Sequence, residues 1–334
     1  MRIPKSLSYS SMSLYEKDKE EFFIRYLADK PAPRLPQEAP ASVGASFDAR
    51  VKSALHEALF GAGADPTFAF QTIFESQVEP HNRDIALEAG KHVLECYKLT
   101  GAYDELLKVL QQSVEPPRFE FKVEGLIAGA PFLGKPDCRF VLDLGDGRIP
   151  CVLDWKVKGY CSKYGASPSK GYMLCRDGYK AEKPSRSHGK EHDNYLAMNF
   201  RGITINSGYM EYCSDEYADQ LCLYAWLLGE KPGDENVVLM IDEIVAKFMG
   251  VGVKPLLRVA NHRARVKADY QAKLLERVAA CWQAITSGHI FSDMSLEDSQ
   301  ARCATLENMA VALISDGSVL DSFFNECTRP QFKH

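Results

Sequence analysis

The 334-residue sequence predicts an α/β protein of the α+β kind, with one central mixed sheet flanked by helices. Three observations predict it. Apolar residues recur at helical spacing up to residue 112, strand-like alternation follows between 118 and 157, and helical patterns return around two more strands after residue 215. An apolar fraction of 46% excludes a disordered chain, and 23 glycines exclude a collagen-like one.

The N-terminal third of the chain is predicted to be helical. Leu14, Phe22 and Tyr26 form an apolar stripe behind a cluster of serines that can cap a helix. Four prolines between residues 29 and 41 predict a loop, and Phe47, Val51 and Leu55 then repeat at four-residue spacing. The predicted helices cover 8–28, 43–60, 85–99 and 103–112.

The predicted sheet begins as an antiparallel meander. Phe119, Phe121 and Val123 alternate with charged residues, and the Asp146-Gly147 dipeptide is typical of a tight hairpin. Residues 158–212 have no steady period and form a predicted loop insertion, of a length that is usually functional or mobile. The predicted strands cover 118–127, 132–144, 149–157, 236–248 and 255–262, and the later helices 215–228, 266–285 and 295–313. We expect one domain, 1–334, with a helical N-terminal region (1–117), a sheet core (118–262) and a helical C-terminal region (263–334).

Two aspartates lie near neighbouring strands of this meander. Asp137 and Asp154 are separated by enough chain for a strand to run out, turn and return, so their carboxylates can meet at one end of the sheet. Such a pair is a hard oxygen site suited to Mg²⁺ or Mn²⁺. Lys156 projects from the same strand face as Asp154, where its ammonium can hold a phosphate oxygen or stabilise a hydroxide. Metal, carboxylates and lysine together are what phosphodiester hydrolysis requires.

These residues resemble the signature of the PD-(D/E)XK nuclease superfamily, which is present as Pro136-Asp137 and as Asp154 to Lys156. Other motifs are similar to those of its RecB-like branch, which includes phage-type exonucleases. Gln220 and Tyr224 match a Q-x-x-x-Y element and lie one helical turn apart. Residues 8–26 resemble the N-terminal helix of that branch.

A further helix motif, G-x-x-x-H, is matched by Gly44 to Asp48, with an aspartate where a metal-binding histidine is common. The resemblance covers roughly 8–60 and 118–228. It implies a restriction-endonuclease-like fold and a metal-dependent DNA exonuclease, phage or phage-derived, that serves recombination or DNA processing. The implied metal is Mg²⁺ or Mn²⁺, held by Asp48, Asp137 and Asp154, and the implied catalytic residues are Asp137, Asp154, Lys156, Gln220 and Tyr224.

Several alternatives stay open at this point. Asp48 also fits a solvated helix residue, Gln220 and Tyr224 also fit an ordinary helix face, and Glu124 is a further candidate beside the metal. The protein can instead be an endonuclease of the same superfamily or a non-catalytic DNA-binding subunit. Expected partners are DNA and a single-strand annealing or recombination protein, and a homo-oligomer is a further expectation; no membrane partner is expected.

The cysteine pattern does not favour other metals. Zinc sites usually contain C-x₂₋₄-C pairs, so zinc is not expected at Cys161, Cys175, His188 and His192. Some relatives hold an iron–sulfur cluster, but the wide spacing of Cys281, Cys303 and Cys327 predicts none. With no signal peptide and no apolar run of bilayer length, we expect reduced thiols and a cytoplasmic location, in the host if the protein is from a phage.

The net charge of −5 does not indicate a nucleic-acid binder, but its distribution does. Residues 155–201 contain ten lysines and arginines against four acids, a local net charge of +6, and aromatic residues are interleaved with them. Cations that contact phosphates and aromatic rings that stack on bases are the combination used for single strands. A solvated loop is the alternative. The residues expected to contact DNA are Lys158, Lys163, Lys170, Arg176, Lys180, Lys183, Arg186, Lys190 and Arg201.

Overall fold

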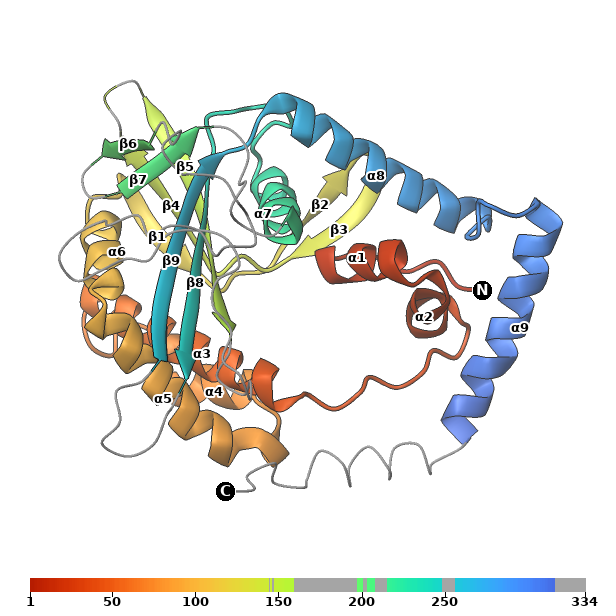
Figure 1. The fold of residues 1–334 in the computed structure, drawn as a ribbon, viewed down its shortest axis with the longest axis horizontal. Helices are drawn as coiled ribbons and strands as arrows, with labels where there is room; N and C mark the ends of the chain where they lie inside the picture. The colour runs from red at the N-terminus through yellow and green to blue at the C-terminus, as the bar shows by residue number, and fades with distance from the viewer. Residues whose placement is uncertain are drawn as a thin grey trace.

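The structure is a computed structural model that describes residues 1–143, 145, 147–158, 197–200, 203–207, 215–247 and 256–315. Its strands are β1 (Glu115–Phe119), β2 (Val123–Ile127), β3 (Ala130–Gly134), β4 (Cys138–Asp143), β5 (Arg148–Lys158), β6 (Ala197–Phe200), β7 (Ile203–Ser207), β8 (Val238–Lys247) and β9 (Leu256–Arg265). Within the described residues, seven of them form a mixed sheet in the order β1-β4-β5-β8-β9-β7-β6, and β2 and β3 form a separate hairpin (Figure 1). The β5–β8 and β7–β9 pairs are parallel, and the others are antiparallel.

Helices flank this sheet, as predicted. They are α1 (Tyr9–Lys17), α2 (Lys19–Phe22), the π-helical turn η1 (Phe23–Leu27), α3 (Ala39–Phe60), the 3₁₀ turn η2 (Pro66–Phe68), α4 (Phe70–Gln77), the 3₁₀ turn η3 (Pro80–Asn82), α5 (Arg83–Leu99), α6 (Ala102–Leu110), α7 (Asp215–Leu227), α8 (Ala268–Ser287) and α9 (Leu296–Ser315). The predicted α/β fold, with helices before and after a central mixed sheet, is confirmed. None of the described helices is long and apolar enough to cross a membrane.

Two predicted strands are each divided in two. The predicted strand 118–127 is β1 and β2, because Glu120 between them adopts a left-handed backbone with φ 49° and donates its N–H to the Asp137 carbonyl at 3.2 Å. The predicted strand 132–144 is β3 and β4, with residues 135–137 as the break. The meander therefore splits into a β2–β3 hairpin and the β1-β4-β5 portion of the main sheet.

Other boundaries also differ from the prediction. The helix expected over 8–28 breaks at Asp18, which is extended and whose Oδ1 accepts the N–H of Glu21 at 2.9 Å, capping α2. The next helix begins at Ala39 rather than 43, because Pro40 fits the first turn of a helix. Helix α4 was not predicted. The predicted loop 158–212 contains β6 and β7, strands of four and five residues that are too short to show a periodicity.

The sheet separates two hydrophobic cores. One core packs α3, α5 and α6 against inward residues such as Leu153 and Met240, and the other packs α1, α7 and α8 against Val152 and Ile241 (Figure 1). Alternate residues of β5 and β8 thus face opposite helical layers, which is why both strands are rich in apolar residues. Residues 152, 154, 156 and 158 of β5 share the face that α7 covers.

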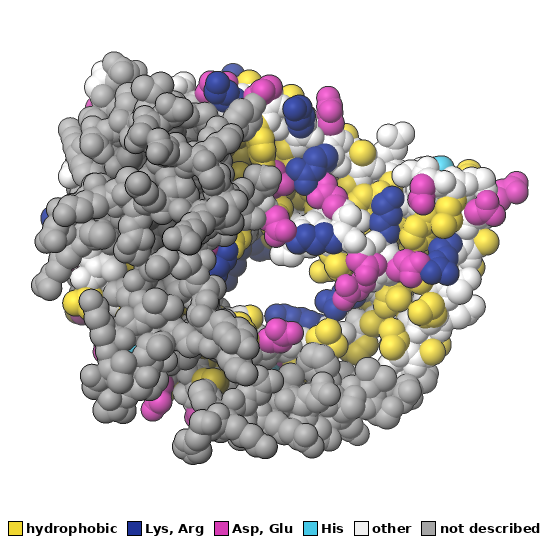
Figure 2. Space-filling model, in the orientation of Figure 1, with side chains coloured by type: hydrophobic (Ala, Val, Ile, Leu, Met, Phe, Trp, Pro, Cys, Tyr) yellow, Lys and Arg dark blue, Asp and Glu magenta, His cyan; other side chains and the backbone are white. Residues whose placement is uncertain are grey.

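The space-filling view shows an opening through the molecule between the side that carries the sheet and the side that carries α1, α2 and α9 (Figure 2). Basic and acidic side chains both lie along the described portion of its edge. The chain between α2 and α3 runs along another stretch of this edge (Figure 1). The two helical layers are thus joined by extended chain as well as by the sheet.

The contact between α3 and α5 gives a stability prediction. A Cβ on Gly90 of α5 would lie 2.3 Å from the Ser46 Oγ and 2.9 Å from the Phe47 backbone N, whereas one on Gly44 would meet nothing within 4 Å. We expect Gly90→Ala to lower the free energy of unfolding by about 1–3 kcal/mol, because α3 and α5 must separate. Gly44→Ala, within α3, is the matched control and should raise it by about 0.5–1 kcal/mol through helix propensity.

Urea denaturation followed by circular dichroism measures both changes. Equal stabilities for the two variants would contradict the close packing of α3 on α5. Because α3 also carries Asp48, this packing fixes the helix from which one side of the site is built.

Candidate functional site

The pairing of β4 with β5 brings Asp137 beside Asp154. Cys138 opposes Leu153, so the residue that precedes β4 lies next to the residue that follows Leu153. The Trp155 N–H donates to the Asp137 Oδ2 at 3.0 Å and holds that carboxylate at the start of the strand. The two aspartates are therefore neighbours, as predicted, but they lie where β4 begins and within β5, which continues to Lys158 beside β8, rather than at one end of the whole sheet.

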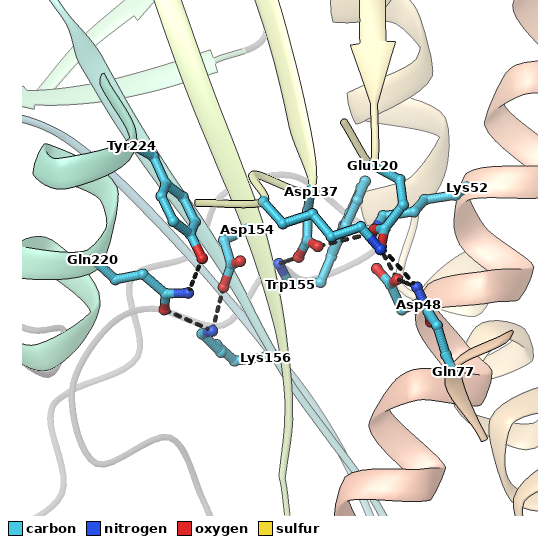
Figure 3. A network of polar contacts seen from close by, with 11 residues as sticks. Asp48, Lys52, Gln77, Glu120, Asp137, Asp154, Trp155, Lys156, Gln220 and Tyr224 are labelled. Carbon is cyan, nitrogen blue, oxygen red and sulfur yellow. Dashed lines mark hydrogen bonds and ion pairs between the residues drawn. The ribbon is translucent and has the colours of Figure 1, made fainter. Parts of the chain in front are cut away.

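Lys156, Gln220 and Tyr224 extend the site towards α7 (Figure 3). The Lys156 Nζ forms an ion pair with the Asp154 Oδ2, as expected for neighbours on one strand face. It also donates to the Gln220 Oε1 at 3.0 Å, and the Gln220 Nε2 donates to the Tyr224 Oη at 2.8 Å. Because Gln220 and Tyr224 are one helical turn apart, their side chains contact each other, and the Gln220 amide can bond Tyr224 and Lys156 at the same time.

A second polar group reaches Asp137 from the α3 side (Figure 3). Asp48 on α3 and Glu120 after β1 each place a carboxylate oxygen within 4.8 Å of one on Asp137. Lys52, one turn after Asp48, contacts all three: its Nζ lies 2.6 Å from Asp48, 2.8 Å from Asp137, and in hydrogen-bond contact with Glu120. The two polar groups meet at Asp137.

The sequence prediction did not include Glu120, Lys52 or Gln77. Gln77, the last residue of α4, donates to Glu120 at 2.9 Å and to Asp48 at 3.2 Å. Glu120 was assigned to a continuous strand, and only its left-handed backbone turns it towards Asp137. The sequence did contain a signal for Lys52. It lies one helical turn after Asp48, and it directly follows Val51 of the apolar stripe, which places its side chain near both Asp48 and the buried face of the helix. Glu124 is exposed and pairs with Lys122.

The charges in the site are strongly coupled. Burial, with the charge of Asp137, raises the pKa of the Asp154 carboxyl well above its usual range. Burial acts on Asp137 in the same direction, but the ammonium groups of Lys52 and Lys156 outweigh it and hold its pKa below the usual value. Burial opposes the charge of Lys52, yet Asp137 and Asp48 raise its pKa. The site therefore keeps Asp137 ionised between two ammonium groups.

Asp48, Glu120 and Asp137 form a group that could bind a divalent metal. The donors are all carboxylate oxygens, the ligand type that Mg²⁺ and Mn²⁺ prefer. The Asp48 Oδ1 is buried and has no hydrogen-bond partner among the described residues, which leaves an oxygen available to a cation. The donor chemistry of these residues therefore fits a hard divalent ion, although Lys52 already contacts each of the three carboxylates.

Beyond Lys156, the same face of the sheet carries a further run of polar residues. Lys158 pairs with the buried Glu243 at 2.6 Å, and the His262 Nε2 lies 3.2 Å from the other oxygen of Glu243. The Lys156 and Lys158 Nζ atoms each lie 5.1 Å from the centre of the Tyr217 ring. Lys158 is the one described member of the expected DNA-contacting set.

Other predicted candidates lie outside the described residues. These are the remaining expected DNA contacts, Lys163, Lys170, Arg176, Lys180, Lys183, Arg186, Lys190 and Arg201, and the four zinc candidates Cys161, Cys175, His188 and His192. Six cysteines in the described portion of the chain are free and buried, namely Cys96, Cys138, Cys151, Cys222, Cys281 and Cys303.

Comparisons with known proteins give one distant likeness. No family model matches the chain, and no curated protein matches it. A crystal structure from Eubacterium rectale, described as a "putative exonuclease", is similar with a TM-score of 0.39 and 12% sequence identity, over 86% of this chain and 88% of that one.

Close packing at Gly134 gives a test of how α7 is positioned. A Cβ on this residue would lie 2.8 Å from the Tyr224 ring and 3.0 Å from Leu227. We expect Gly134→Ala to cost about 1–3 kcal/mol of unfolding free energy, because α7 must shift away from β3.

A double-mutant cycle with Tyr224→Ala isolates the ring contact. In the Tyr224→Ala background the substitution at Gly134 should cost at least about 0.5 kcal/mol less, the lower end of coupling between residues in contact. Additive effects in denaturation experiments would show that the ring does not pack on Gly134.

Proposed function

We propose that this chain is a metal-dependent deoxyribonuclease of the RecB-like branch of the PD-(D/E)XK superfamily, and that it acts as an exonuclease. The observation that carries the proposal is the convergence of Asp137, Asp154 and Lys156 at one end of the β4–β5 pair, with Gln220 bonded to the lysine. This set supports phosphodiester hydrolysis because it joins oxygen ligands for a hard cation to a positioned ammonium. A phage or phage-derived origin, with a role in recombination or DNA processing, belongs to the proposal, as do a cytoplasmic location and a single-strand annealing partner.

The metal would be held by the carboxylates, with Asp137 and Asp154 as its core and Asp48 as the third candidate. A bound Mg²⁺ or Mn²⁺ would supply a Lewis acid for the phosphate and would lower the pKa of a coordinated water. Asp154 and Asp137 offer oxygens from adjacent strands, so their separation is fixed by the sheet. Ligands must be deprotonated, and the low pKa of Asp137 meets this condition in the metal-free site. The pKa of Asp154 is raised there by burial and by the charge of Asp137, and a bound cation would lower it.

Lys156 is the proposed positioning group for the attacking water or a phosphate oxygen. Burial disfavours its charge, but Asp154 and Asp137 raise its pKa, so the ammonium persists at neutral pH. The Gln220 Oε1 accepts a hydrogen bond from the Lys156 ammonium, and the Gln220 Nε2 donates to Tyr224, so the direction of the remaining lysine N–H groups is fixed. These contacts restrict the lysine to one orientation before the substrate arrives.

DNA would approach along the face that carries Lys158 and Tyr217. Lys158 is the first residue of the expected DNA-contacting set, and its side chain is about one-third exposed. Its pairing with Glu243 balances its charge in the free protein and leaves it close to Lys156. A phosphate that replaces Glu243 as its partner would then lie beside the proposed catalytic lysine.

The first prediction for this function concerns Lys156 and Asp154. Lys156→Ala and Asp154→Asn should each lower the rate of Mg²⁺-dependent degradation of linear DNA by about 10²–10³-fold, the usual loss when a group that stabilises developing charge is removed. End-labelled DNA assays measure the rate. Lys91→Ala, an exposed lysine on α5, is the control and should retain full activity. Full activity in the Lys156 and Asp154 variants would refute this site.

The alternatives are separated by two further assays. An exonuclease leaves covalently closed circular DNA intact, whereas an endonuclease of the same superfamily cuts it. A non-catalytic DNA-binding subunit would bind DNA without cleavage in either Mg²⁺ or Mn²⁺. Comparing 5′- and 3′-labelled, single- and double-stranded substrates in the same experiment gives the polarity and strand preference.

A further inference from the structure

Lys52 is a fully buried cation in the middle of the carboxylate group. Its side chain is 0% exposed, and it contacts Asp48 at 2.6 Å, Asp137 at 2.8 Å, and Glu120 as well. A single ammonium therefore serves all three carboxylates that could hold a metal. Lys52 has no role in the proposed chemistry at Lys156, and its position needs a separate account.

The arrangement is stable only as a unit. Buried carboxylates without a cation are strongly unfavourable, and so is a buried ammonium without anions. Lys52 and Asp48 lie one turn apart on α3, so the same helix presents both. That helix is held against α5 at Gly90 and against the sheet core by Phe47, Val51 and Leu55. Moving the Lys52 ammonium away from this group would leave both the ammonium and the three carboxylates without a compensating charge.

A divalent ion and this ammonium compete for the same oxygens. If the ion entered the group while Lys52 stayed, two cations would lie within a few ångströms of each other, with few carboxylate oxygens between them. Asp154, in contrast, is paired with Lys156 on the other side of Asp137, and its oxygens are not engaged by Lys52. Lys156 would keep Gln220 as a partner if an ion displaced it from Asp154, and its side chain is 23% exposed, whereas Lys52 is 0% exposed and, among the described residues, contacts only the three carboxylates. An ion can therefore displace Lys156 from Asp154 more readily than it can displace Lys52 from its group, which leaves the side of Asp137 that faces Asp154 for a metal.

We propose that Lys52 is a built-in cation that excludes a divalent ion from the Asp48, Glu120 and Asp137 group, so that the protein binds one metal ion, at Asp137 and Asp154. Asp48 then serves to hold Lys52 rather than the metal. The inference rests on the metal-binding component of the proposed function and sets the number of bound metal ions at one. Lys52 supplies the positive charge that a second ion would otherwise bring to Asp137.

Metal stoichiometry tests this directly. Purified, metal-stripped protein is titrated with Mn²⁺ by calorimetry, and free Mn²⁺ is followed by electron paramagnetic resonance. The wild type should bind one ion. Lys52→Met, which keeps a long unbranched side chain and removes the ammonium, should bind two. Two ions in the wild type, or one in Lys52→Met, would overturn the proposal.

Lys135→Met is the matched control. Lys135 also contacts Glu120, but it is 53% exposed and, among the described residues, forms no ion pair with Asp48 or Asp137. Its loss leaves Lys52 in place, so this variant should bind one ion. Lys52→Arg retains a cation and should also bind one. A second ion in Lys135→Met would mean that general loss of positive charge, rather than Lys52, controls the stoichiometry.

Folding of Lys52→Met needs its own measurement. We expect a lower melting temperature without metal and a larger upward shift on adding Mn²⁺ than in the wild type, because the ion replaces the missing cation. If this variant does not fold, Asp48→Asn decides. Its Mn²⁺ affinity should stay close to that of the wild type, and a fall of about tenfold or more, the size expected when a ligand or its partner is lost, would overturn the proposal.

The outcome is distinguishable from failure of the proposed function. One ion in the wild type and two in Lys52→Met, without DNA cleavage, would support the inference and refute the nuclease. DNA cleavage by a wild type that holds two ions would support the nuclease and refute the inference. Asp154→Asn should lose the single ion in either case, which checks where it binds.

Discussion

The site depends on the balance between buried carboxylates and buried ammonium groups. Asp48, Glu120, Asp137 and Asp154 would repel one another if they were alone at the end of a strand pair. Lys52 on one side and Lys156 on the other make the cluster compatible with a folded interior. The layered fold supplies these two cations from opposite faces of the sheet: α3 brings Lys52, and β5 brings Lys156 beneath α7.

Asp137 can join the two halves because it precedes β4 rather than lying within it. A residue inside a strand faces one side of the sheet, whereas a residue at the start of one can be reached from both. The Trp155 N–H fixes one of its oxygens and Lys52 binds the other. The break after β3, with Gly134 packed closely on Tyr224, brings the chain to this position. The register of β4 on β5 is thus the geometric condition for the whole site.

The sequence predicts the half of the site whose residues follow regular periods. Asp154 and Lys156 lie two residues apart on one strand and therefore on the same face, and Gln220 and Tyr224 lie one turn apart on a helix, so both contacts follow from spacing. The other half depends on irregular structure. Glu120 points inward because its own backbone is left-handed, in the middle of an alternating pattern. Gln77 comes from a short helix that was not predicted. Lys52 has a residue type that is almost always exposed, so only its partners in the folded protein explain its burial. The α/β class was predictable from the same periodicities. The division of two strands was not, because it depends on contacts between residues far apart in the sequence, such as the bond from the Glu120 N–H to the Asp137 carbonyl.

The parallel pairing of β5 with β8 has an evolutionary consequence. The chain leaves the site just after Lys156, at the end of β5, and returns through α7 five residues before Gln220. The strand pair and the helix that hold the proposed reacting groups are therefore complete without residues 159–214 between them. Insertion, deletion or exchange of residues 159–214 would leave the pairing of β4, β5 and β8 and the helix turn that joins Gln220 to Tyr224 unchanged. Change in this stretch of the gene and preservation of the candidate site can therefore proceed separately.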